Sequence, residues 1–113
     1  MLAVETPLLA HHAWPVDRSK QITVKGTVAS YTWGNPHVMI GLDVTAANGI
    51  VERWNVGGPN PTRMSSNGWD RSTLKEGDVI TGVGFQFSNG QKVVQLQKIV
   101  MADGREMLLY GRR

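Results

Sequence analysis

Three histidines are the side chains of this sequence best suited to bind a metal. They occur in two short motifs, the adjacent pair His11-His12 and the segment Asn35-Pro36-His37. The sequence has no cysteine, so a transition-metal site would be built mainly from imidazole, carboxylate or backbone nitrogen. If processing left His11 as the first residue, its amine and ring could chelate one metal, with His37 as a third nitrogen. Such a set of nitrogen ligands suits copper(II), with zinc(II) or nickel(II) next.

The same histidines also have a structural interpretation. Neighbouring side chains of an extended segment point to opposite faces, so only one of His11 and His12 meets His37 unless the backbone turns. His12 and His37 could instead hydrogen-bond the turn and the start of the chain. Turn chemistry alone accounts for Asn35-Pro36, because proline fixes its φ angle and asparagine tolerates tight turns. Both interpretations stay open at this point.

The four tryptophans are a second candidate for binding. Aromatic side chains on a barrel face can stack on bases, sugars or a flat ligand. We expect Trp54 and Trp69 to lie in the core or at its rim, with each indole N–H hydrogen-bonded. Trp14 and Trp33 flank the histidine motifs, so they are the candidate interaction residues, and we expect them to line one pocket.

Patterns typical of enzymes are weak in this chain. Gly82-Val83-Gly84 lies inside a strand pattern with no helix after it to bind a phosphate. Ser65-Ser66 lacks the strained turn of a hydrolase nucleophile. The acidic residues fall at turns or on polar strand positions, where we expect them to be solvated; they are Asp43, Glu52, Glu76, Asp78 and Asp103. We therefore expect no catalytic activity.

Composition favours a small β domain. The 113 residues suffice for one domain with a modest core, and 13 glycines with five prolines indicate many tight turns. The net charge is +3, but the lysines and arginines are scattered along the chain, which disfavours a nucleic-acid-binding surface. No stretch approaches the roughly 18 apolar residues of a membrane helix.

Alternating apolar residues and turn signals predict the elements that position these side chains. Strands are expected at residues 21–33, 38–44, 50–56, 79–87, 92–101 and 106–110. A short helix is expected at 62–66, with Asn60 as its cap and Pro61 in its first turn. This order predicts an all-β, OB-like barrel of five to six strands with one short helix between strands 3 and 4. The alternative is an open barrel or sandwich of another topology.

Several short motifs occur in a characteristic order along this framework. They are His11-His12, Trp33-Gly34-Asn35-Pro36-His37, Arg53-Trp54, Gly57-Gly58-Pro59-Asn60, Gly68-Trp69, Leu74-Lys75-Glu76-Gly77-Asp78 and Asp103-Gly104-Arg105. Together they resemble an uncharacterised family of short exported bacterial proteins, a domain of unknown function. This chain departs from that pattern at Ala13-Trp14, where the family tends to have Ser-Phe. The resemblance implies a periplasmic or otherwise exported protein, and it implies no established activity.

The first ten residues are interpreted separately from the barrel. Residues 1–10 are similar to the end of a secretory signal, with Ala10 at a plausible cleavage point, although Glu5 interrupts the apolar run. We therefore expect either a signal remnant or an N-terminal arm at 1–10, followed by one OB-like domain at 11–113.

The function expected from the sequence is that of a non-catalytic interaction module. Such a module would be exported and would dock as an accessory subunit on a larger protein assembly, for example a membrane-bound one. The alternative is a periplasmic copper- or zinc-binding protein that uses His11, His12 and His37. A nucleic-acid-binding OB domain is the third class, which the scattered charge disfavours.

Overall fold

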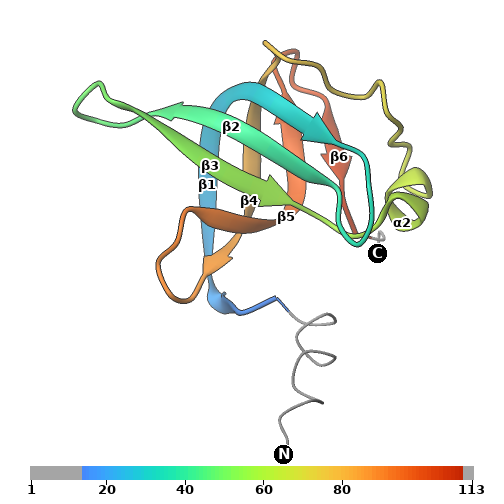
Figure 1. Ribbon diagram of the computed structural model, residues 1–113, viewed down its shortest axis with the longest axis horizontal. Coiled ribbons are helices and arrows are strands. Elements are labelled where there is room, and N and C mark those ends of the chain that lie inside the picture. The colour runs from blue at the N-terminus through green and yellow to red at the C-terminus, as the bar shows by residue number, and fades with distance from the viewer. Residues whose placement is uncertain (1–13, 111–113) are drawn as a thin grey trace, which may run out of the picture.

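The structure is a computed structural model and describes residues 14–110. The predicted segment 1–10 and the pair His11-His12 lie outside the described residues. The elements are β1 (Val16–Thr32), β2 (Met39–Thr45), β3 (Val51–Gly57), α2 (Pro61–Ser65), β4 (Val79–Phe87), β5 (Val93–Met101) and β6 (Glu106–Leu108) (Figure 1). The predicted order of three strands, a helix, two strands and a short last strand is confirmed.

The strands close into an OB-like barrel. The strand order is β3-β2-β1-β4-β5-β6, and a parallel pairing of β3 with β5 closes the ring. All other neighbouring strands are antiparallel. The long strand β1 belongs to both halves, since residues 16–27 pair with β4 and residues 27–32 pair with β2. The all-β, OB-like prediction is therefore confirmed.

Glycine lets β1 bend between its two partners. A Cβ atom on Gly26 would lie 2.6 Å from the carbonyl oxygen of Asp43 in β2, closer than a side chain permits. The register of β1 against β2 then shifts between Val28 and Ser30, which marks a β-bulge. A glycine and a bulge together allow the sharp coiling that a closed barrel requires.

Two more glycines bring β4 against β5. A Cβ on Gly82 would lie 2.7 Å from Cδ2 of Leu96, and a Cβ on Gly84 would overlap the carbonyl oxygen of Gln95. Both glycines are buried. The close approach of the two backbones fixes the position of Gln95, whose side chain contributes to the site described below.

Alternating strand residues fill the barrel. The buried core consists of Val24, Val28, Val38, Ile40, Leu42, Val56, Met64, Trp69, Leu74, Ile80, Val94, Leu96, Ile99 and Leu109. It contains a residue from α2 and one that follows β6, so both segments are anchored to the barrel. Burying this apolar surface is the main driving force for the fold.

The short helix α2 begins at the predicted cap. The Asn60 side chain accepts a hydrogen bond from the backbone N–H of Arg63 at 2.9 Å, and Pro61 occupies the first turn. Met64 points into the core, which leaves the side chain of Arg63 exposed at the surface. Among residues 14–110, no helix is long and apolar enough to cross a membrane.

Candidate functional site

An open pocket lies at one rim of the barrel, where segments far apart in the sequence meet. In Figure 1 the β1–β2 loop, α2 and the end of the described chain lie together at this rim. The pocket has a volume of about 430 Å³. Its walls are formed by Trp14, Asn35, Pro36, His37, Pro59, Asn60, Arg63, Gln95 and Tyr110. We call this cavity the rim pocket.

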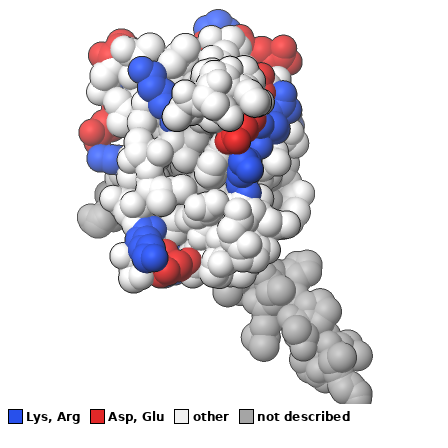
Figure 2. Space-filling model, turned by 90° about the vertical axis from the view of Figure 1, so that its left-hand side faces the viewer, with Lys and Arg blue, Asp and Glu red and all other residues white. Residues whose placement is uncertain are grey.

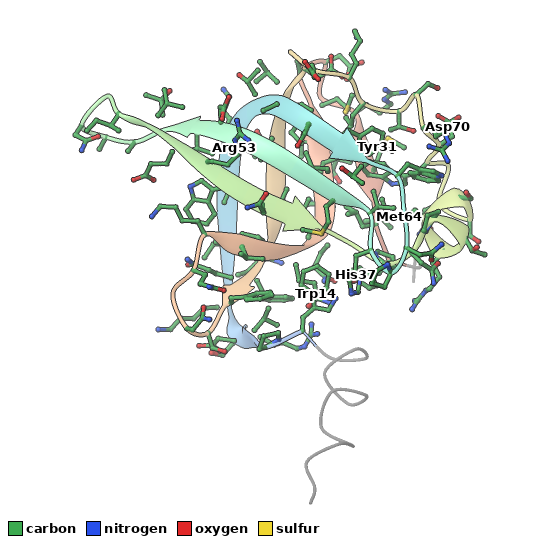
Figure 3. All side chains as sticks on the ribbon, viewed as in Figure 1. Trp14, Tyr31, His37, Arg53, Met64 and Asp70 are labelled. Carbon is green, nitrogen blue, oxygen red and sulfur yellow. The ribbon has the colours of Figure 1, made fainter. Side chains whose placement is uncertain are left out.

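His37 enters the rim pocket from the β1–β2 loop in a fixed orientation. Its Nδ1 lies 3.1 Å from the carbonyl oxygen of Gly58. A carbonyl oxygen only accepts hydrogen bonds, so Nδ1 is the donor in this contact and Nε2 takes no part in it. The ring also packs edge-on against Trp14, with 4.7 Å between ring centroids and 63° between the planes (Figure 3).

Trp14 is also held by the end of β4 and by the turn that follows it. Its ring makes a second edge contact with Phe87, at 5.9 Å between centroids. The next residue, Pro15, accepts hydrogen bonds from the backbone N–H and the hydroxyl of Ser88, at 2.8 and 2.7 Å. The backbone at Trp14 is thus tied to the barrel immediately before β1 begins.

Gln95, Tyr110 and Arg63 form the polar side of the rim pocket. Gln95 is only 4% exposed, and its Nε2 donates to the Tyr110 hydroxyl at 2.9 Å. Its Oε1 is buried and has no hydrogen-bond partner within residues 14–110. The guanidinium of Arg63 lies 5.6 Å from the centre of the Tyr110 ring, within the range of a cation–π contact.

The Tyr110 hydroxyl stays protonated at neutral pH. Burial raises the pKa of Tyr110 above its ordinary value, because a buried phenolate loses its hydration. The hydrogen bond from Gln95 and the positive charges of Arg63 and Arg18 act in the opposite direction without reversing the shift. Tyr110 therefore presents a neutral hydroxyl that can donate a hydrogen bond.

The two tryptophans predicted to line one pocket are separated. Trp14 lines the rim pocket with His37, whereas Trp33 is not among its walls. Trp33 packs beside Tyr31, at 6.2 Å between centroids, and both rings lie against the core. Residues two apart on an extended chain share a face, and the Tyr31 hydroxyl ties that face to the carbonyl oxygen of Asp70 at 2.6 Å. Figure 3 shows Tyr31 near Asp70 and away from Trp14.

The indole N–H groups of Trp54 and Trp69 were both expected to be hydrogen-bonded, and this is confirmed for Trp69. Nε1 of the buried Trp69 donates to the carbonyl oxygen of Leu108 at 2.8 Å. Nε1 of Trp54 is also buried, but it has no partner among the described residues. Both rings lie in the core or against it, as predicted, but the predicted hydrogen bond of Trp54 Nε1 is absent within residues 14–110.

Of the three predicted metal ligands, the structure describes His37, because His11 and His12 lie outside the described residues. Within residues 14–110, no three histidine or acidic side chains come together in a way that could hold a metal ion. The contact of His37 Nδ1 with a backbone carbonyl oxygen is one that metal-binding imidazoles usually show.

Charged side chains elsewhere on the surface are dispersed. Figure 2 shows lysine and arginine side chains spread over one face, with acidic side chains among them. The ion pairs are exposed, as in the contact of Arg53 with Asp43 at 2.7 Å. The rim pocket differs from this mixed surface, because within residues 14–110 no acidic residue is among its walls.

Arg63, Gln95 and Tyr110 were not identified from the sequence as site residues. Gln95 did carry a signal, since it is a polar residue inside the apolar run of β5 and such residues are buried only with a hydrogen-bond partner. Arg63 and Tyr110 carried none. They meet only because α2 and the segment after β6 pack on the same end of the barrel.

Solved structures with the same fold include TiaS and a DNA-binding protein. TiaS in its complex with tRNA and ATP is 18% identical with a TM-score of 0.54, over 79% of this chain and 19% of TiaS. The mitochondrial single-stranded DNA-binding protein Rim1 of S. cerevisiae is 8% identical with a TM-score of 0.55, over 74% of this chain and 93% of Rim1. This chain thus spans about a fifth of TiaS, and these likenesses establish the fold alone. A comparison with curated protein sequences gives no match.

A family assignment comes from the sequence itself. Residues 1–95 match the family described as "Family of unknown function (DUF6152)". This range includes the histidine motifs, the Gly57–Asn60 segment and most of the barrel. It confirms the resemblance to an uncharacterised domain family that the motif order indicated. The chain belongs to DUF6152, a family of unknown function.

Proposed function

We propose that this protein is a non-catalytic, exported module that binds a partner protein through the rim pocket. The observation that carries the proposal is the convergence of Trp14, Tyr110 and Arg63 on one open pocket. Tryptophan, tyrosine and arginine are the residue types that contribute most binding energy at protein interfaces. The volume of about 430 Å³ lies within the usual range for binding pockets.

The walls of the rim pocket are held in place without a ligand. The chain at Trp14 is fixed by the bonds between Pro15 and Ser88, and His37 is fixed by the carbonyl oxygen of Gly58. A site whose side chains are already ordered loses less conformational entropy when a partner binds. This rigidity supports a docking role for a small accessory subunit on a larger assembly.

Site-specific photo-crosslinking in the native cells tests this proposal. A photoreactive amino acid replaces Thr62, which is exposed on α2 beside the rim pocket. The matched control replaces Ala47, which is exposed in the β2–β3 hairpin turn. We expect a discrete protein adduct from position 62, lost in the Trp14→Ala background, and none from position 47. No adduct from position 62, or an equal adduct from both positions, contradicts the proposal.

A second candidate function is binding of copper or zinc by His11, His12 and His37. The observation that favours it is the geometry of His37, whose Nδ1 faces a carbonyl oxygen while its Nε2 is left for a metal. Trp14 contacts the His37 ring, and His12 is two residues from Trp14 in the sequence, a span that can reach about 7 Å when fully extended. The chain therefore has the length to bring an imidazole of the pair to the rim pocket.

Metal titration separates the two functions. Calorimetry with Cu²⁺ and Zn²⁺ is performed on the mature protein and on its His37→Ala and His12→Ala variants. Asn35→Ala serves as the matched control, because Asn35 lines the rim pocket without an imidazole. The metal function predicts one equivalent bound and an affinity lowered by about tenfold or more in the histidine variants only. Substoichiometric binding, or equal affinity in all four proteins, removes this candidate.

A further inference from the structure

The charge of the rim pocket indicates the chemistry of its ligand. Its charged or titratable walls are Arg63, His37 and the neutral Tyr110, with no carboxylate among the lining residues that the structure describes. The described ion pairs use other residues, so Arg63 has no acidic partner within residues 14–110. The positive charge of Arg18 also acts on Tyr110. A concave site with positive charge and no compensating carboxylate attracts an anion.

Arg63 is oriented for a planar anion. Its guanidinium lies over the Tyr110 ring, which limits the directions in which its N–H groups can point. The side chain is exposed, so those N–H groups are accessible to a ligand. A guanidinium edge matches a carboxylate with two parallel hydrogen bonds.

Tyr110, oriented by Gln95, adds a hydrogen-bond donor. The Tyr110 hydroxyl accepts from Nε2 of Gln95, so its own proton is free to be donated to a carboxylate. An acidic side chain of a peptide supplies the carboxylate that suits Arg63 and Tyr110 together.

We propose that the rim pocket recognises an acidic segment of the partner protein, through its carboxylate at Arg63 and Tyr110. This inference rests on the proposed function and names the ligand class. The apolar walls Trp14 and Pro36 suit a neighbouring aliphatic side chain. A peptide fits this combination better than a nucleic acid does, because phosphate tracking requires a row of basic residues.

Selection from a displayed random-hexapeptide library tests the ligand class. The baits are the wild-type protein, Arg63→Gln, Trp14→Ala, and the control Arg105→Gln, which removes the same charge from an exposed position in the β5–β6 turn. We expect wild type and Arg105→Gln to enrich peptides with aspartate or glutamate by about three- to tenfold. Arg63→Gln should lose this preference for acidic residues, and Trp14→Ala should no longer bind the selected peptides.

The outcomes separate the two proposals. Peptides without acidic enrichment that still depend on Trp14 overturn the ligand class and leave the proposed function intact. Peptides that bind Trp14→Ala as well as they bind wild type place the site elsewhere and contradict both proposals. The acidic-peptide inference is overturned if the selection yields no peptides, or if a single-stranded oligonucleotide displaces them at physiological salt. The crosslinking experiment tests the proposed function independently.

Discussion

Removal of an indole N–H can be compared at two tryptophans, one whose N–H is hydrogen-bonded and one whose N–H is not. Trp69 is 2% exposed, and its Nε1 donates to the carbonyl oxygen of Leu108 at 2.8 Å. Trp54 packs on the same core, and its buried Nε1 has no partner among the described residues. Trp69→Phe and Trp54→Phe therefore form a matched pair.

The expected cost of Trp69→Phe is the sum of two contributions. Losing the hydrogen bond and leaving the Leu108 carbonyl unpaired costs about 1–2 kcal/mol. Replacing the indole with a smaller ring in a fully packed core adds about 1–2 kcal/mol through lost contacts and a residual cavity. The free energy of unfolding should fall by about 2–4 kcal/mol in total. Trp54 is only partly buried, so Trp54→Phe loses less packing, and it also removes an unpaired buried N–H, so its change should stay within about 1 kcal/mol.

Urea unfolding followed by far-ultraviolet circular dichroism measures both changes at one temperature. In thermal melts the loss for Trp69→Phe corresponds to a fall in Tm of about 10–25 °C for a domain of this size. Leu108 precedes Tyr110 by two residues, so Trp69→Phe should also loosen one wall of the rim pocket. Equal losses of stability for the two variants, or a larger loss for Trp54→Phe, would refute this account of the core.

Further predictions concern the tyrosines, the helix cap and the bend of β1. Burial raises the pKa of Tyr31 to about 12, against an ordinary value of 10.0. Because the folded state favours the protonated form, this stabilisation is complete below pH 10 and is lost between pH 10 and about 12. An absorbance titration of the Tyr110→Phe variant should thus show Tyr31 ionising later than free tyrosine, and a midpoint near 10 would be inconsistent with its burial. Asn60→Ala should cost about 0.5–2 kcal/mol in urea unfolding, because the cap bond to α2 is lost, whereas Asn60→Asp should retain most of it. Gly26→Ala should cost about 1–3 kcal/mol in thermal melts, because a Cβ cannot approach β2 so closely; wild-type stability would count against the close contact.

Most of the framework could be predicted from local sequence patterns. The predicted limits of β4, Val79–Phe87, and the cap at Asn60 agree with the structure. The start of β1 was placed at Gln21, although the strand begins at Val16. The intervening polar residues give no alternation, and the pairing of Val16 with Phe87 is a tertiary contact that a local pattern cannot reveal. The last strand was likewise predicted to reach Tyr110, but β6 ends at Leu108.

The candidate site could be predicted only in part, for a physical reason. His37 and Trp14 belong to short motifs, so residue type and spacing drew attention to them. The contact of Arg63 with Tyr110 joins residues 47 positions apart in the sequence, and it exists only because both flank the same end of the barrel. The separation of Trp33 from Trp14 has the same origin, since the direction in which Trp33 points depends on where β1 ends.

Hydrogen–deuterium exchange on the complex with the crosslinked partner tests the role of the rim pocket most directly. Partner binding should slow exchange in residues 33–38, 58–63 and 108–110, which surround the rim pocket. The β2–β3 hairpin at residues 45–51 should be unaffected and serves as an internal reference. Protection confined to that hairpin, with unchanged exchange around the rim pocket, would contradict the account.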